Sequence, residues 1–135
     1  GGGAAAAAAR GRESGRLGMA TSTERTASGI TIKMLRAGTS DIYPQVSQSL
    51  AVHYDAFLPN GKMWDSSRKR GVPLRFRMGA GQVIPGLNDA VSQLSMGMRA
   101  RVTIPADQAY GERGFPGLVP PNSTVEFDLE LLEIV

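Results

Sequence analysis

The residue types that usually carry acid–base, nucleophilic or metal chemistry are scarce in this chain of 135 residues. It has no cysteine and a single histidine, His53. A cysteine nucleophile, a thiolate metal site and a site with several histidines are therefore excluded. Ser66 and Ser67 have no visible base partner, and no nucleophile-elbow pattern surrounds them. A hydrolase or a metal-dependent enzyme is thus poorly supported, and no cofactor and no metal are expected.

The remaining candidates for a functional site are apolar and aromatic side chains, accompanied by one acid, Asp65, next to Trp64. Trp64, Tyr110 and Phe115 lie outside clean strand patterns, and loop aromatics that frame a sheet often line a pocket. Composition alone also allows the whole set to be hydrophobic core. The set consists of Tyr54, Trp64, Leu74, Phe76, Val83, Ile84, Leu87, Tyr110, Phe115 and Phe127.

One short helix is predicted over residues 85–94. Pro85 suits a first helical turn because its φ is fixed near the helical value and its missing N–H would have no partner there. From Leu87 to Leu94, apolar residues repeat at i, i+3, i+4 and i+7, which is one face of a helix. Since no other segment predicts a helix convincingly, this one has to cover the apolar face of the strands.

Alternation with period two predicts strands at 30–34, 50–55, 74–78, 100–104 and 125–131. Residues 62–71 contain Asp-Ser-Ser, which favours local side-chain-to-backbone hydrogen bonds, so an irregular or bulged strand is expected there. The alternation breaks at Leu131–Leu132, which predicts a bulge or a strand end. Connections without helical crossovers favour an antiparallel sheet with one face covered by the helix.

The chain divides into two regions of different composition. Residues 1–28 are low in complexity and are predicted to be a disordered N-terminal extension. Residues 29–135 are predicted to form one folded domain and hold 11 basic and 10 acidic side chains. This near neutrality gives no argument for a nucleic-acid partner. No apolar run approaches the length of a membrane span, so no membrane partner is expected.

Five short motifs in fixed order resemble the FKBP family of peptidyl-prolyl isomerases, the tacrolimus- and rapamycin-binding immunophilins. The motifs are Val52-His53-Tyr54, Gly61-Lys62-x-x-Asp65-Ser66-Ser67, Gln82-Val83-Ile84-x-Gly86, Ala109-Tyr110-Gly111 and Pro116-Gly117-x-x-Pro120-Pro121-Asn122-x-Thr124. The resemblance covers roughly residues 29–135. It implies an α+β fold, in which a five- to six-stranded antiparallel sheet wraps around one short α-helix.

The resemblance also implies a pocket between the helix and the sheet. Residues at the catalytic positions are Asp65, Tyr110, Phe127 and Tyr54. Residues at the substrate- and ligand-binding positions are Trp64, Arg70, Leu74, Gln82, Val83, Ile84, Leu87, Phe115, Leu118 and Val119. By the same resemblance, the Ile84 N–H and the Tyr110 hydroxyl bind ligand carbonyls. Asp65 faces the pocket and is held by hydrogen bonds, including one from the Tyr54 hydroxyl.

Several positions depart from the best-known members of the family. Leu87 stands where they place a tryptophan at the floor of the pocket, and Leu74 and Trp64 each replace a phenylalanine. Phe115 stands where a histidine is common. A leucine floor keeps the pocket apolar, so we expect activity to be retained and drug affinity to be the property at risk.

The function implied by the resemblance is acceleration of X-Pro rotation in an apolar pocket, without covalent catalysis. The implied partners are proline-containing peptides and proteins and macrolides of the tacrolimus and rapamycin type. A cytoplasmic monomer is expected. The alternative is an FKBP-like binding module or co-chaperone with weak or no isomerase activity, which the departures at Leu87 and Phe115 keep open.

Overall fold

The computed structural model describes residues 23–135, so the predictions for residues 1–22 lie outside the described part. Within residues 23–135, seven antiparallel strands form one sheet in the order β1-β2-β6-β7-β3-β4, and β5 pairs with β3 beside β4. The strands are β1 (Thr23–Arg25), β2 (Thr31–Arg36), β3 (Ser49–Phe57), β4 (Met63–Ser66), β5 (Leu74–Arg77), β6 (Arg99–Ile104) and β7 (Val125–Ile134). The helical segments are α2 (Ser67–Arg70), α3 (Pro85–Ser92) and the 3₁₀ turn η1 (Ala106–Gln108).

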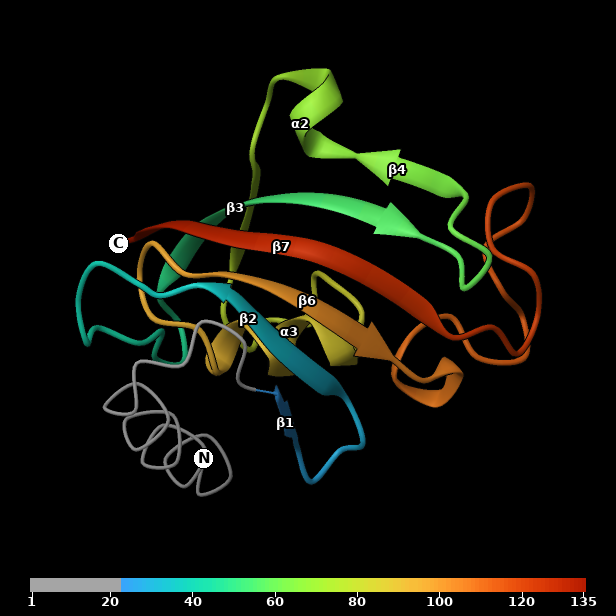
Figure 1. Ribbon diagram of the computed structural model, residues 1–135, viewed down its shortest axis with the longest axis horizontal. Coiled ribbons are helices and arrows are strands. Elements are labelled where there is room, and N and C mark those ends of the chain that lie inside the picture. Colours follow the sequence, from blue (N-terminus) through green and yellow to red (C-terminus); the bar gives the residue numbers. More distant parts are fainter. Residues whose placement is uncertain (1–22) are drawn as a thin grey trace.

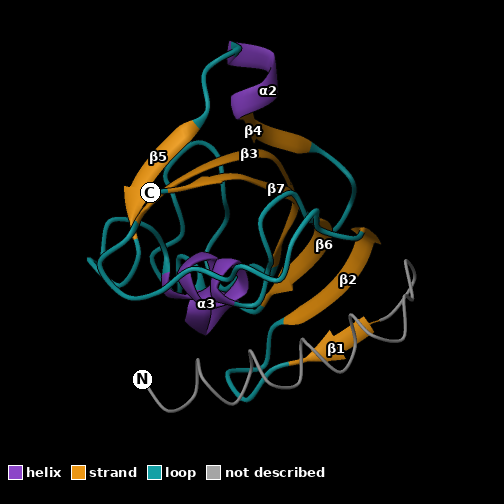
Figure 2. Cartoon of the chain, turned by 90° about the vertical axis from the view of Figure 1, so that its left-hand side faces the viewer, coloured by secondary structure: helices purple, strands orange, loops and turns teal. Residues whose placement is uncertain are grey.

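The sheet is curved, and α3 lies along its concave side (Figures 1 and 2). The side chains on that side, from both the strands and the helix, form one continuous hydrophobic core. The expected arrangement, an antiparallel sheet around a short helix, is therefore confirmed. None of the helices in residues 23–135 is both long enough and apolar enough to cross a membrane.

Strand β7 shows how the period-two pattern builds this core. Its four inward residues, Val125 to Leu131, are at most 2% exposed, whereas the acids between them are partly exposed. The register against β3 pairs Ala51 with Glu133 but Val52 with Leu131. Leu132 is thus an extra residue, and the predicted bulge at this position is confirmed.

Helix α3 begins at Pro85, as predicted, with Ile84 as its N-cap residue. Leu87, Ala90 and Val91 are buried against the sheet. Gly86 allows the first turn to lie close to the end of β6, because a Cβ at this position would be 2.3 Å from Cγ2 of Ile104. The close approach of the Gly86 backbone to Ile104 therefore sets the position of the start of α3 relative to the sheet.

Two segments differ from the sequence-based predictions. Disorder was expected up to residue 28, but Thr23–Arg25 form β1, which pairs with β2. The following turn is tied to α3, since the hydroxyls of Thr26 and Ser28 both donate to Oδ2 of Asp89. The bulged strand expected at 62–71 is confirmed for β4, because its register pairs Asp65 with Ala56 but Met63 with Phe57 and leaves Trp64 as an extra residue. The rest of this segment differs from the prediction, since Ser67–Arg70 form the single turn of α2. Ser66 caps this turn by accepting the Lys69 N–H at 3.0 Å.

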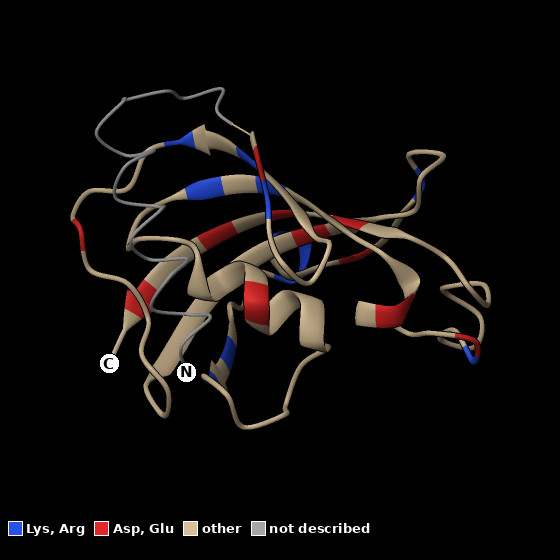
Figure 3. Cartoon of the chain, turned by 90° about the horizontal axis from the view of Figure 1, so that it is seen from below, with Lys and Arg blue, Asp and Glu red and all other residues tan. Residues whose placement is uncertain are grey.

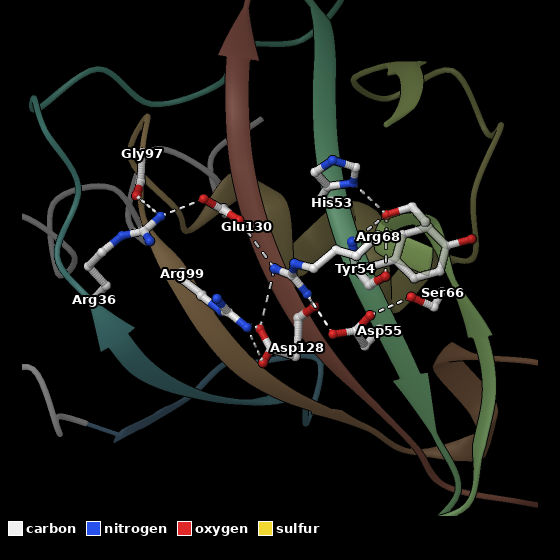
Figure 4. A network of polar contacts seen from close by, with 11 residues as sticks. Arg36, His53, Tyr54, Asp55, Ser66, Arg68, Gly97, Arg99, Asp128 and Glu130 are labelled. Atoms are coloured by element: carbon white, nitrogen blue, oxygen red, sulfur yellow. Dashed lines mark hydrogen bonds and ion pairs between the residues drawn. The ribbon is translucent and has the colours of Figure 1, made fainter. Parts of the chain in front are cut away.

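The convex face of the sheet carries a network of ion pairs (Figure 4). Arg68 bonds to Asp55 at 2.8 Å and to Glu130 at 3.3 Å, and Arg99 holds both oxygens of Asp128 at 2.8 and 2.9 Å. The acids of β7, which the alternation placed on the outward face, are therefore paired with arginines. Acidic and basic positions accordingly lie on neighbouring strands in Figure 3.

Candidate active site

A cavity of ≈ 280 Å³ opens between the start of α3 and the concave face of the sheet. Its walls come from β3, β4, β5, β7, α3 and the segment after η1. The lining residues are Tyr54, Trp64, Asp65, Leu74, Gln82, Val83, Ile84, Leu87, Tyr110 and Phe127. All of them are residues that the sequence resemblance proposed for the site, so residues far apart in the sequence do come together here.

Four aromatic side chains line the cavity and pack against one another. The ring of Phe127 meets those of Tyr54 and Trp64 edge-on, with centroid distances of 5.8 and 6.0 Å. Trp64 meets Tyr110 at 5.7 Å, and Tyr110 meets Phe115 at 5.4 Å, again nearly perpendicular. Such contacts add to the stability gained by burial. The cavity is thus an apolar site with aromatic walls.

Asp65 is the one carboxylate that lines the cavity. It accepts the Tyr54 hydroxyl at 2.5 Å and the Ser66 N–H at 2.8 Å, and it forms an ion pair with Arg70. Burial is the largest influence on its pKa and opposes ionisation, but the bonds from Tyr54, Arg70 and Ser66 outweigh it and hold the pKa below its ordinary value. Asp65 is therefore ionised at neutral pH.

Tyr54 is oriented through both its hydroxyl and its backbone. Burial, followed by the hydrogen bond to Asp65, raises the pKa of its phenol, which keeps the proton on Tyr54. Strand β4 pairs with β3 from Asp55 onward and β5 pairs only up to Val52, so Tyr54 has no strand partner on that side. The hydroxyl of the fully buried Ser67 fills this gap by accepting the Tyr54 N–H at 2.7 Å.

His53 completes this arrangement on the convex side of the sheet. Its Nδ1 lies 2.9 Å from Oγ of Ser67 (Figure 4). The expectation that Ser67 has no base partner is therefore wrong, but the pair is not a nucleophile with its base. Ser67 is 0% exposed and its hydroxyl is engaged with the backbone of Tyr54. His53 and Ser67 are positioning residues. Their role becomes clear only from the pairing of the sheet, in which neither β4 nor β5 reaches Tyr54 on β3.

The Tyr110 hydroxyl and the Ile84 N–H are donors at the cavity for which residues 23–135 provide no hydrogen-bond partner. Burial raises the pKa of the Tyr110 phenol, with a further contribution from the charge of Asp65, so the hydroxyl stays protonated. The Ile84 N–H precedes the first turn of α3, where backbone donors lack helical acceptors. Both groups are available to carbonyl oxygens of a ligand.

Four of the predicted site residues do not line the cavity. Arg70 lies behind Asp65 and bonds to it and to Oη of Tyr54, the latter at 3.0 Å. Phe115 and Leu118 are 43% and 44% exposed in the segment after η1. Val119 is 4% exposed and pairs with Phe115 through an isolated bridge. Direct contact between these four residues and a ligand stays a prediction.

Within residues 23–135, no group of three or more His, Cys, Asp or Glu side chains is arranged to hold a metal ion. What the cavity offers instead is an apolar enclosure, one ionised carboxylate and a few directed donors.

Comparison with known proteins identifies the family. The family of FKBP-type peptidyl-prolyl cis-trans isomerases matches residues 40–132. This chain belongs to the FKBP family. FK506-binding protein 1 of Yarrowia lipolytica is 48% identical to this FKBP over 106 residues, which cover 78% of the chain and 98% of that protein. Peptidyl-prolyl cis-trans isomerase Fkbp12 of Drosophila melanogaster is 44% identical over 106 residues, with the same coverage of 78% and 98%.

The fold is similar to that of a solved FKBP structure. The crystal structure of FkpA from Escherichia coli superposes with a TM-score of 0.76 at 35% sequence identity. The match covers 97% of this chain but 60% of FkpA, so it concerns the shared domain. The protein is an FKBP-type peptidyl-prolyl cis-trans isomerase, as the sequence motifs led us to expect.

Proposed function

We propose that the cavity is the place where this FKBP binds a proline-containing segment and accelerates rotation about the X-Pro bond. Tyr54, Asp65, Tyr110 and Phe127 are the proposed catalytic residues, and the other cavity residues bind the ligand. The observation that carries this proposal is the cavity itself, which combines aromatic walls with one carboxylate and two available donors.

The chemistry requires no covalent step. The X-Pro bond has partial double-bond character, with a barrier of about 18–20 kcal/mol. The twisted amide loses resonance, so its charge distribution differs from that of the planar form. An apolar cavity disfavours the more dipolar planar amide, and directed donors stabilise the twisted amide selectively. Raising a rate of about 0.01 s⁻¹ to about 10 s⁻¹ takes roughly 4 kcal/mol. Desolvation and one or two hydrogen bonds are sufficient for that.

The same cavity is the proposed site for tacrolimus and rapamycin. Several relatives of this chain are named FK506-binding proteins, and FK506 is tacrolimus. The Ile84 N–H and the Tyr110 hydroxyl provide donors for carbonyls of such a macrolide. Leu87, which is 4% exposed and lines the cavity, provides the floor. A leucine covers less of an apolar ring than a tryptophan does, which reduces the area buried on binding.

Leu87→Trp is expected to keep tacrolimus binding or to tighten it by up to about tenfold, because the indole adds apolar contact area beneath the bound ring. Titration calorimetry on the wild type and the variant measures this. Leu35→Trp is a matched control, since Leu35 is 41% exposed on β2 and does not line the cavity. A large loss of affinity in Leu87→Trp alone would mean that Leu87 is not the floor of the binding site.

The remaining features of the proposal concern the whole chain. Residues 29–135 are the proposed isomerase domain, preceded by an N-terminal extension whose last part contributes β1. The Yarrowia relative is covered over 98% of its length by the matched segment, which supports a domain that acts alone. A monomer in the cytoplasm is the proposed working state, and the absence of cysteine from the sequence agrees with a reducing compartment.

A further inference from the structure

Trp64, the only tryptophan in the chain, has an unusual place in the cavity wall. It lies on β4 and packs nearly perpendicular to both Tyr110 and Phe127. Its Nε1–H is buried and has no hydrogen-bond partner within residues 23–135. An indole nitrogen in a protein acts only as a donor, so no change of its protonation could satisfy it. The wall of the cavity thus contains a buried donor without an acceptor.

An unpaired buried donor is uncommon, because it forfeits its hydrogen bond to water without replacement. A phenylalanine, which the resemblance places at this position in the best-known relatives, would fill the wall without that cost. The nearby carboxylate of Asp65 does not accept the indole proton, since its bonds are to Tyr54, Ser66 and Arg70. Packing alone therefore explains an aromatic ring at residue 64 but not the N–H that it carries.

We propose that the Nε1–H of Trp64 is a third donor for the bound ligand and that it bonds a peptide carbonyl next to the proline. This rests on the proposed function of the cavity. A half-turn about the Cβ–Cγ bond brings the buried nitrogen edge of the indole to the cavity while the ring stays in its plane. The corresponding torsion of tryptophan is broad and roughly two-fold, so both orientations are accessible. Trp64 thereby favours ligands with an exposed carbonyl acceptor beside the ring.

Trp64→Phe provides a test, because the variant should bind the substrate more weakly without becoming less stable. The variant keeps an aromatic wall and removes only the donor and part of the ring. KM for an X-Pro peptide should rise about tenfold with kcat nearly unchanged, which is the result of losing one hydrogen bond made equally in ground and transition states. The melting temperature should stay the same or rise, because an unpaired buried group is gone. An unchanged KM, or KM and stability worsening together, would show that Trp64 is only a wall.

The side-chain resonance of Trp64 gives a second, direct readout in the full-length protein. With one tryptophan, the ¹H–¹⁵N spectrum contains one indole N–H signal. On addition of an unlabelled X-Pro peptide, this signal should move downfield and exchange more slowly with deuterium, while the backbone N–H of Ile84 also shifts. A shift of Ile84 without any change of the indole signal would overturn the role of Trp64 alone. No shift at either group would overturn the proposed binding site as well.

Discussion

Phe127→Ala is expected to destabilise the fold by about 3–5 kcal/mol and to remove most isomerase activity. Phe127 is 2% exposed on β7, in the middle of the sheet. Its ring supports both Tyr54 and Trp64, so its removal leaves a void between two walls of the cavity. Because domains of this size are stable by only about 5–15 kcal/mol, the loss is a large part of the total.

Urea unfolding and the rate of peptide isomerisation, measured on the same samples, separate the two effects. Phe115→Ala is the matched control, since Phe115 is 43% exposed and contacts the ring of Tyr110. Phe115→Ala should lower the free energy of unfolding by less than about 1 kcal/mol, as expected for a substitution at an exposed position. Equal destabilisation by the two variants would mean that Phe127 does not support the cavity as described.

Gly86→Ala should destabilise the protein by about 1–3 kcal/mol and slow isomerisation, because it forces the start of α3 away from the sheet. The added Cβ would lie 2.3 Å from Cγ2 of Ile104 and 2.9 Å from the carbonyl oxygen of Gln108. Alanine is the better helix former by about 1 kcal/mol. The sign of the change in stability therefore depends on whether the clash costs more than that gain. One of the two obstacles is backbone, which cannot move aside like a flexible side chain. We therefore expect the clash to dominate.

Gly111→Ala is a useful comparison for Gly86→Ala. Gly111 has φ of +60°, and no atom lies within 4 Å of its added Cβ, so this variant isolates backbone strain. Its cost is expected to be about 1–2 kcal/mol, without displacement of α3. The shift of α3 should appear only in Gly86→Ala, as changes in the backbone N–H signals of Ile84 and Leu87. A stabilised Gly86→Ala protein with an unchanged cavity would contradict the close approach described above.

Much of the fold could be predicted because its core strands follow simple patterning. The alternation in β7 and the break at Leu132 identified both the strand and its bulge. Strand β1 escaped prediction because Thr23–Arg25 carry no apolar pattern, and their order depends on pairing with β2 and on the contacts of Asp89. The single turn of α2 escaped for a similar reason, since four residues are too few for a periodic signal.

The sequence motifs predicted most of the residues that line the cavity. They did not predict the roles that depend on tertiary contacts. Most of the residues that the resemblance proposed do line the cavity, but Phe115 and Leu118 are 43% and 44% exposed and do not line it. The roles of Ser67 and His53 depend on the missing strand partner of Tyr54, which no local pattern reveals. The unpaired nitrogen of Trp64 likewise becomes visible only once its neighbours are in place.

The central claim is that the cavity between α3 and the sheet carries the isomerase activity. The most direct measurement is the cis-to-trans rate of a chromogenic X-Pro peptide, with the full-length protein and increasing rapamycin. The account predicts a rate that rises in proportion to protein concentration and falls to the rate in buffer at one equivalent of rapamycin. A protein that gives no acceleration would support a binding module instead. Acceleration that persists with rapamycin bound would place the activity outside the cavity and contradict the account.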